Sequence, residues 1–115
     1  MSEDRLQQEC YLWFHNNFPN LRGLLFHPAN GGSRSSREGA KFKAMGVVPG
    51  VSDLLFIYNQ RLYAIELKTE TGVQSEKQKT WQYRVESEGV SYYITRSLEE
   101  FKEIIIKITA DLYYK

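Results

Sequence analysis

Residues 52–68, SDLLFIYNQRLYAIELK, are the part of the sequence that most restricts the fold. Two runs rich in aliphatic and aromatic residues stand on either side of Asn59 and Gln60, which is the pattern of two strands joined by a turn. Asn-Gln is not a preferred pair for a two-residue turn, so a longer loop with the same centre is an alternative. Both versions predict one hairpin with the same pairing of its strands.

That pairing brings three charged residues to one end of one face of the hairpin. Asp53 lies opposite Glu66, at roughly 4.5–5.5 Å between Cβ atoms, and Lys68 shares the face of Glu66 because side chains alternate along a strand. Two carboxylates this close repel each other, and partial burial raises the pKa of one of them. A Mg²⁺ or Mn²⁺ ion would remove the repulsion, with a backbone carbonyl such as that of Leu67 as a further ligand.

An ordinary hairpin is the alternative interpretation of the same residues. Asp53 would then cap the end of a strand, and Glu66 and Lys68 would lie in solvent. The spacing of these three residues is common by chance, so on its own it favours the ordinary hairpin. If a metal is bound, Lys68 would orient an attacking water or neutralise charge that develops on a phosphate.

The rest of the sequence predicts an α/β fold, a mixed sheet flanked by helices. Ser75 with Gln78, and Ser97 with Glu100, have the spacing of capping boxes at the start of two helices. The 115 residues suit a single domain over 1–115. The predicted elements are a helix over 2–18, a strand over 23–28, a helix over 37–45, the hairpin, a helix over 75–89, a strand over 90–96 and a helix over 97–108.

Composition narrows the class of protein. The net charge is +1, so any surface that binds nucleic acid must be local. Cys10 is the only cysteine, which favours a reducing compartment. The polar N-terminus is unlike a secretory signal, and no apolar run approaches the roughly 18–20 residues that cross a bilayer. These features predict a soluble cytoplasmic protein without a membrane partner.

Four stretches extend the pattern of the hairpin over almost the whole chain. They are EDRLQQECYLWF (3–14), HPANGGSRSSREGAKFKAMG (27–46), MGVVPGVSDLLF (45–56) and YAIELKTETGVQSEKQKTW (63–81). Together they resemble the virus-type replication–repair nuclease (VRR-NUC) domain of the PD-(D/E)XK nuclease superfamily. Ser52 stands where that family usually has a proline, a position that stiffens the strand and takes no part in chemistry.

The resemblance implies a restriction-endonuclease-like core and a role for particular residues. Asp53 and Glu66 would be metal ligands, and Lys68 would be the catalytic lysine. Gln78 is either a helix cap or a residue that faces the site, and the two roles are equally supported. Two residues of the first helix also align with family positions. Gln7 aligns with a glutamine. Glu3 aligns with the acidic partner of that glutamine, so it would be a further metal ligand.

A basic segment upstream of the hairpin is the predicted DNA-binding surface. It follows a loop of small residues whose free backbone N–H groups suit close approach of a phosphate backbone. A solvated helix face is the ordinary explanation of such a run of charge. Lys79 and Arg84 would extend a second, weaker set that contains Lys77. The predicted DNA-binding residues are Asn30, Arg34, Arg37, Lys41, Lys43 and Lys77.

The function that follows is a Mg²⁺- or Mn²⁺-dependent endonuclease that cuts DNA phosphodiester bonds. Stand-alone domains of this kind resemble the dimeric Holliday-junction resolvases of phages and prokaryotes, so the resemblance implies a homodimer that acts on branched DNA in a phage or prokaryotic host cytoplasm. A two-fold junction needs two symmetric cuts, which an isologous dimer supplies. Candidate interface residues are Tyr92, Tyr93, Tyr113, Tyr114 and the run Ile104–Ile106.

Other functions compete with this one. A nicking or flap-type nuclease would act on other branched or single-stranded DNA. A non-catalytic DNA-binding subunit would keep the fold, although it would gain nothing from a crowded acidic pair. Cleavage of RNA is a further alternative, because sequence alone does not exclude recognition of the ribose 2′-OH.

Overall fold

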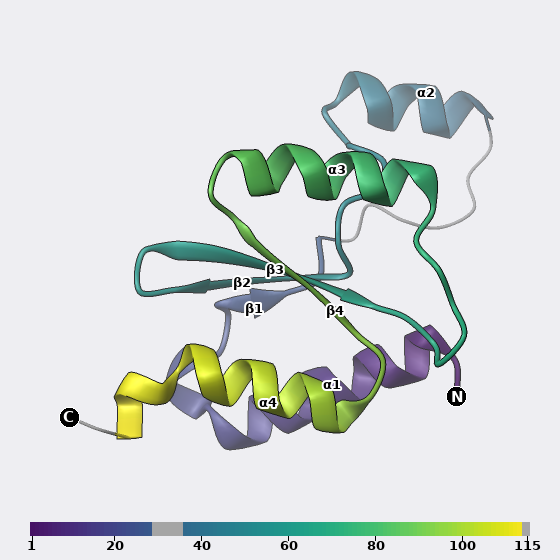
Figure 1. Ribbon diagram of the computed structural model, residues 1–115. Coiled ribbons are helices and arrows are strands. Elements are labelled where there is room, and N and C mark those ends of the chain that lie inside the picture. Colours follow the sequence, from purple (N-terminus) through teal and green to yellow (C-terminus); the bar gives the residue numbers. More distant parts are fainter. Residues whose placement is uncertain (29–35, 114–115) are drawn as a thin grey trace.

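The computed structural model describes residues 1–28 and 36–113. It contains a four-stranded mixed sheet in the order β1-β2-β3-β4, with helices on both faces (Figure 1). This architecture confirms the predicted α/β fold. The strands are β1 (Leu25–Phe26), β2 (Leu54–Tyr58), β3 (Arg61–Leu67) and β4 (Ser91–Thr95). The helices are α1 (Glu3–Asn17), α2 (Ser36–Ala44), α3 (Glu76–Ser87) and α4 (Leu98–Ile108), with short 3-10 turns η1 (Pro19–Leu21) and η2 (Ala110–Tyr113).

The hairpin of β2 and β3 has the predicted register, with Tyr58 paired to Arg61. Asn59 and Gln60 form a tight two-residue turn, with φ angles of 51° and 63°. Positive φ at both central positions is the conformation that matches the right-handed twist of two antiparallel strands, which is why it is preferred in short hairpins. The alternative of a longer loop is therefore wrong, even though Gln60 is an unusual residue for this conformation.

Replacing Gln60 with glycine should stabilise the protein. A side chain with a Cβ is disfavoured in the left-handed region by roughly 1–2 kcal/mol, and glycine avoids this strain at some cost in entropy of the unfolded chain. We expect Gln60→Gly to raise the free energy of unfolding by about 0.5–1 kcal/mol in urea titrations. Gln60→Ala is the control and should give no gain. An equal gain from both variants would contradict strain as the cause.

The remaining sheet pairs place the far end of the chain beside β3. β4 runs parallel to β3, with Ala64 opposite Tyr92 and Glu66 opposite Ile94. Parallel neighbours need a long crossover, and α3 provides it. β1 is a two-residue edge strand that pairs antiparallel with β2.

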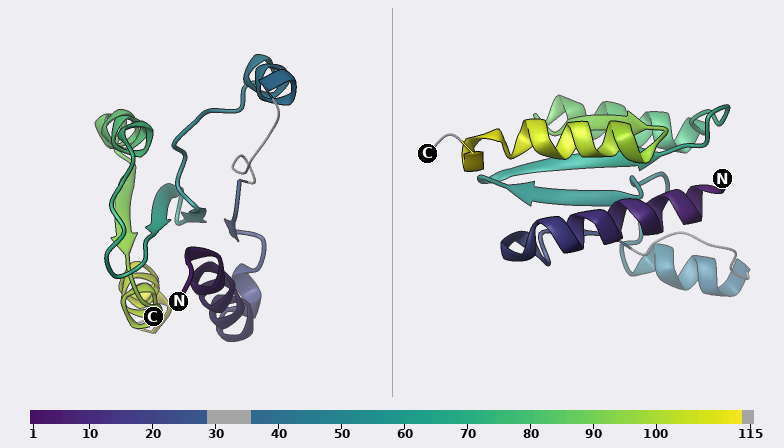
Figure 2. Two further views of the ribbon diagram at one scale, coloured as in Figure 1. Left: turned by 90° about the vertical axis from the view of Figure 1, so that its right-hand side faces the viewer. Right: turned by 90° about the horizontal axis from the view of Figure 1, so that it is seen from below.

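One face of the sheet carries the hydrophobic core. α1 and α4 lie together under this face (Figures 1 and 2). The apolar side chains that pack here recur at three- and four-residue intervals along one side of each helix. The buried core is formed by Leu6, Cys10, Phe14, Phe18, Leu25, Leu54, Phe56, Ile65, Leu67, Phe101 and Ile105.

The opposite face is covered in part by α3. Ser75 caps this helix and completes the predicted capping box with Gln78, so both N-terminal donors are satisfied. α2 lies off to the side of the sheet rather than on either face (Figure 2). Among the described residues, no helix has the length and apolar character that a membrane span requires.

Candidate active site

Asp53, Glu66 and Lys68 lie together on the sheet face that does not carry the core. Asp53 directly precedes β2, Glu66 is in β3, and Lys68 directly follows β3. Only 1% of Glu66 and 6% of Lys68 are exposed to solvent. The ordinary-hairpin interpretation, with Glu66 and Lys68 in solvent, is therefore wrong. Charged groups buried without a structural ion pair are costly, so they indicate a functional site.

Asp53 is held by a backbone amide and by a histidine side chain. Its Oδ2 accepts a hydrogen bond of 2.7 Å from the Leu67 amide, and its own carbonyl oxygen accepts one of 2.6 Å from Nδ1 of His27. Ser52 is buried, and its hydroxyl donates to the Leu54 carbonyl at 2.9 Å. The segment before β2 is therefore joined by hydrogen bonds to β2, β3 and His27.

Glu66 carries a carboxylate oxygen that has no protein partner. Oε2 accepts a hydrogen bond of 3.0 Å from the Tyr92 hydroxyl, whereas Oε1 is buried and makes no hydrogen bond in the described structure. Burial, and then the adjoining Asp53 carboxyl group, raise the pKa of Glu66 to about 9; Tyr92 and Lys68 oppose the shift. In the metal-free site, this shift favours the protonated form of the Glu66 carboxyl group.

Gln78 links Lys68 to the start of α3. Its Oε1 accepts from Lys68 Nζ at 2.8 Å and from the Ser75 amide at 2.8 Å. The sequence left two roles open for Gln78, a helix cap or a residue that faces the site. Its Oε1 atom caps α3 and also contacts Lys68. Because the helix cap fixes the Gln78 side chain, it also fixes where the Lys68 ammonium group lies.

Tyr92 is the site residue that sequence reasoning missed. As a candidate for an exposed dimer interface it was placed wrongly: it is half-buried, its ring packs against Trp81 at 6.1 Å, and its hydroxyl meets Glu66. Gln74 Nε2 donates to the Tyr92 hydroxyl at 3.3 Å and to Gln82 Oε1 at 2.9 Å. Parallel pairing of the 90–96 strand with β3 would have predicted Tyr92 on the face of Glu66.

Tyr92→Phe should weaken cation binding without unfolding the protein. The variant keeps the ring that packs against Trp81 and removes only the hydroxyl that orients Glu66. Groups that orient a ligand typically affect metal affinity by roughly 10–100-fold when removed. We expect a loss of about tenfold in Mn²⁺ affinity by isothermal titration, with an unchanged circular dichroism spectrum. Tyr93→Phe, on the next position of β4, is the matched control; equal losses in both variants would remove the assigned role.

The first-helix candidates do not join this group. The Glu3 carboxylate lies near the turn after β3, with Oε2 3.5 Å from where a Cβ at Gly72 would be. Gln7 lines a separate pocket between α1 and β1. Within residues 1–28 and 36–113, no group of three His, Cys, Asp or Glu side chains lies close enough together to share one metal ion. Glu3 as a third carboxylate beside the pair is therefore not brought into place, because α1 packs with its first turn beside residues 69–72.

The predicted DNA-binding residues fall into separate regions. Lys77 is exposed on the first turn of α3, and Lys41 and Lys43 are exposed on α2. Arg37 belongs to α2. Asn30, Arg34 and the side chain of Arg37 lie outside the described residues, as do Tyr114 and the side chain of Tyr113 among the interface candidates. Ile106 is exposed on α4, whereas Tyr93 is half-buried.

A small cavity of about 230 Å³ opens beside Asp53. His27, Lys77 and Gln78 are part of its wall. Gly50 brings the preceding loop against α3: its φ is +84°, and a Cβ at this position would overlap the carbonyl oxygen of Lys77. The loop that positions Asp53 and the helix that positions Gln78 are therefore in direct backbone contact.

The residues present fit a divalent cation with oxygen ligands. The unpartnered Oε1 of Glu66 is a buried acceptor next to a second carboxylate. A bound cation would replace the proton that burial otherwise retains on Glu66, which is the usual competition between protons and metals for a carboxylate. Two carboxylates suit Mg²⁺ or Mn²⁺, since Mg²⁺ keeps several waters and is commonly held by one or two carboxylates.

Comparison with solved structures identifies the fold. One, described as a VRR_NUC domain protein, superposes with a TM-score of 0.77 at 24% identity, over 94% of this chain and 88% of that one. The chain has the VRR-NUC fold. A second VRR_NUC domain superposes with a TM-score of 0.58 at 21% identity, over 90% of this chain and 92% of the other. The likeness to VRR-NUC domains is structural, since no family model and no curated protein matches the sequence.

Proposed function

We propose that this chain is a metal-dependent endonuclease that hydrolyses DNA phosphodiester bonds. The observation that supports this most directly is the buried pair of Asp53 and Glu66, with Oε1 of Glu66 unpartnered and Lys68 on the same face. A structural role does not explain the burial of these charged groups, whereas cation binding does. The fold supports the same proposal, because the two solved structures that share it are described as VRR_NUC domains, a name that denotes a nuclease.

Asp53 and Glu66 would hold a Mg²⁺ or Mn²⁺ ion, with the Leu67 carbonyl as a further oxygen. The Leu67 amide points at Asp53, and in an extended strand the carbonyl of the same residue faces the same side. Once bound, the ion would supply Lewis acidity to the phosphate and the attacking water.

Lys68 would act beside the scissile phosphate. Its ammonium group would stabilise the negative charge that grows on the phosphate oxygens, or orient the attacking water. Gln78 would serve as a positioning residue, because its Oε1 holds the Lys68 ammonium group at 2.8 Å. Lys77, which lines the cavity at Asp53, would contact a neighbouring phosphate, and Lys41 and Lys43 would contact the DNA farther away.

We also propose that the nuclease acts as a homodimer on branched DNA in the cytoplasm of a phage-infected or prokaryotic cell. The chain offers one such site, and a four-way junction with two-fold symmetry needs two cuts. The residue set described here contains no element that would read base sequence in a groove, so the shape of the DNA is the expected determinant of specificity.

A cleavage panel tests the proposal. Linear duplex, single strand, flap, splayed arm and four-way junction would be incubated with EDTA, Mg²⁺ or Mn²⁺, and the mass of the protein in solution would be measured by light scattering. Cation-dependent cutting supports the nuclease, and paired symmetric nicks on the junction by a dimer support the resolvase. No cutting with either cation contradicts the nuclease, and equal cutting of every substrate contradicts specificity for branched DNA.

A further inference from the structure

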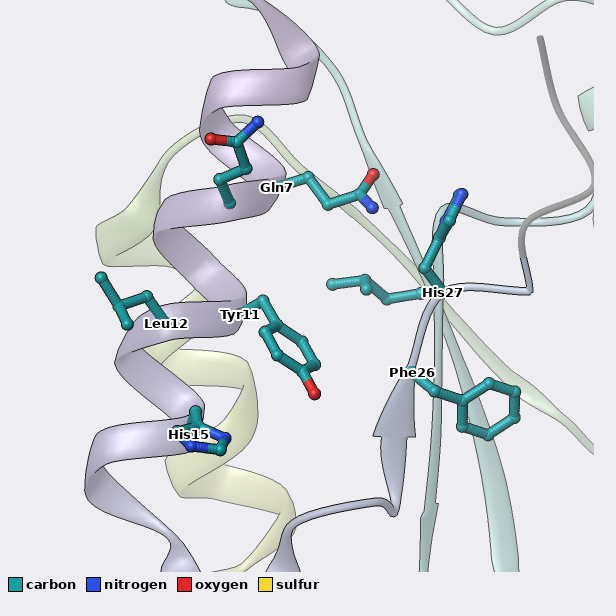
Figure 3. A pocket seen from close by; sticks show the side chains of 8 residues that line it. Gln7, Tyr11, Leu12, His15, Phe26 and His27 are labelled. Carbon is teal, nitrogen blue, oxygen red and sulfur yellow. The ribbon is translucent and has the colours of Figure 1, made fainter.

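A second, larger pocket lies outside the carboxylate site. It has a volume of about 610 Å³ and lies between α1 and the end of β1. Figure 3 shows the Gln7 and Tyr11 side chains on the side of α1 that faces β1 and His27, with the Phe26 ring directed away from the helix. Its volume is in the range of small-molecule sites, roughly 300–1,000 Å³.

The described lining of this α1–β1 pocket is mainly apolar and aromatic, with two amide groups. It contains the rings of Tyr11, His15, Phe26 and His27, the side chains of Leu12 and Leu54, and the side-chain amides of Gln7 and Gln8, and no Asp, Glu, Lys or Arg. The Tyr11 and His15 rings are stacked, with centroids 6.2 Å apart and planes inclined by 26°. A phosphate would find no Lys or Arg among these residues. A flat heterocycle with hydrogen-bonding edges would find both ring faces and amide partners.

His27 connects the α1–β1 pocket to the carboxylate site. It lines both this pocket and the cavity beside Asp53, and its Nδ1 donates to the Asp53 carbonyl oxygen at 2.6 Å. A nucleic-acid strand with a phosphate at Asp53 would therefore carry its neighbouring nucleotide past His27 to the mouth of the pocket. The two sites therefore share the His27 side chain, whose ring is hydrogen-bonded to the Asp53 carbonyl oxygen.

We propose that the α1–β1 pocket binds an unpaired nucleobase of the strand that is cut. The base would stack on Tyr11, with the amides of Gln7 and Gln8 at its edges. This inference rests on the proposed nuclease function and deepens it, because a paired base is not free to enter a pocket at this position. It narrows the proposed branched-DNA substrate to one with an unpaired nucleotide next to the scissile phosphate, as in a flap or splayed arm rather than a fully paired four-way junction.

The test is equilibrium binding in EDTA, where cleavage does not interfere. Fluorescence anisotropy would compare a labelled single strand, the same strand with abasic sites, and the paired duplex. Stacking of a base on an aromatic residue changes affinity by roughly tenfold when the ring is removed. We expect Tyr11→Ala to weaken binding of the normal single strand about tenfold and binding of the abasic strand less than twofold. Tyr11→Phe should bind like the wild type.

Tyr83→Ala is the matched control, because Tyr83 is also an exposed tyrosine, on α3 and outside the pocket. Equal losses in Tyr11→Ala and Tyr83→Ala, an equal loss on the abasic strand, or no binding of the single strand by the wild type would each overturn the base pocket. Cleavage of the same strands by the wild type with Mg²⁺ is measured in parallel. Binding that depends on Tyr11 without any cleavage would contradict the nuclease and leave the base pocket standing.

Discussion

Lys68→Ala is expected to reduce the rate of DNA cleavage by roughly a thousandfold, the size of effect seen when one electrostatic or acid–base group is removed from an active site. The Lys68 side chain is buried on the face of Glu66, and its ammonium group is held by Gln78. Its removal would leave the negative charge of the reacting phosphate without the nearest fixed cation. The measurement is single-turnover cleavage of a branched DNA with Mn²⁺ in excess.

The control for this experiment is Lys107→Ala. Lys107 is an exposed lysine in the last turn of α4, under the core face of the sheet, so its loss should leave the rate within about twofold, as for most surface changes. A melting curve for each variant separates loss of chemistry from loss of fold. If a folded Lys68→Ala protein cleaves within tenfold of the wild type, the catalytic assignment of Lys68 is incorrect.

The metal-free protein should lose stability as the pH rises from about 5 to about 9. The pKa of Glu66 is about 9 in the folded state against 4.5 for an ordinary glutamate, so between these values the folded state holds a proton that the unfolded state has released. Stability then falls with increasing pH, by an amount on the order of several kcal/mol over the window, since each pKa unit corresponds to about 1.4 kcal/mol. Urea unfolding in EDTA at a series of pH values measures this slope.

Glu66→Gln identifies the group responsible. An amide is neutral at every pH in this window, so the variant should match the wild type near pH 5 and be more stable than it near pH 8. Mn²⁺ should stabilise the wild type at pH 8 and have little effect on the variant, because an ion that binds only the folded state raises its stability. A pH slope that persists in Glu66→Gln would assign the effect to another group.

The parts of the fold that were predictable are those that the local sequence specifies. The hairpin register follows from the position of Asn59 and Gln60, since a shift by one residue would turn every core side chain to the other face. The start of α3 follows from Ser75 and Gln78, because a capping box involves residues only three apart. Asp53, Glu66 and Lys68 were brought together by the hairpin alone, so their placement also needed no long-range information.

The parts that were missed depend on contacts between distant segments. Tyr92 reaches Glu66 only because β4 is parallel to β3 after a crossover, and its position in the strand sequence gave no sign of burial. Glu3 shares a helix face with Gln7, as its spacing indicates, but where that face points is set by the packing of α1 on the sheet. The hydrogen bond from His27 to the Asp53 carbonyl likewise joins residues that are far apart in sequence.

The bifurcated acceptor at Gln78 has a consequence for engineering. Oε1 of Gln78 both caps the start of α3 and holds the Lys68 ammonium group. Substitutions of Gln78 would therefore change the thermal stability and the cleavage rate in the same direction. Gln78→Glu would be an exception. The glutamate would still accept the hydrogen bond from the Ser75 amide, but it would place a third carboxylate next to the Lys68 ammonium group. Changing the surroundings of Lys68 without altering the cap of α3 would therefore need a second acceptor. A neighbouring segment would have to supply it, so that it takes over one of the two hydrogen bonds of Gln78.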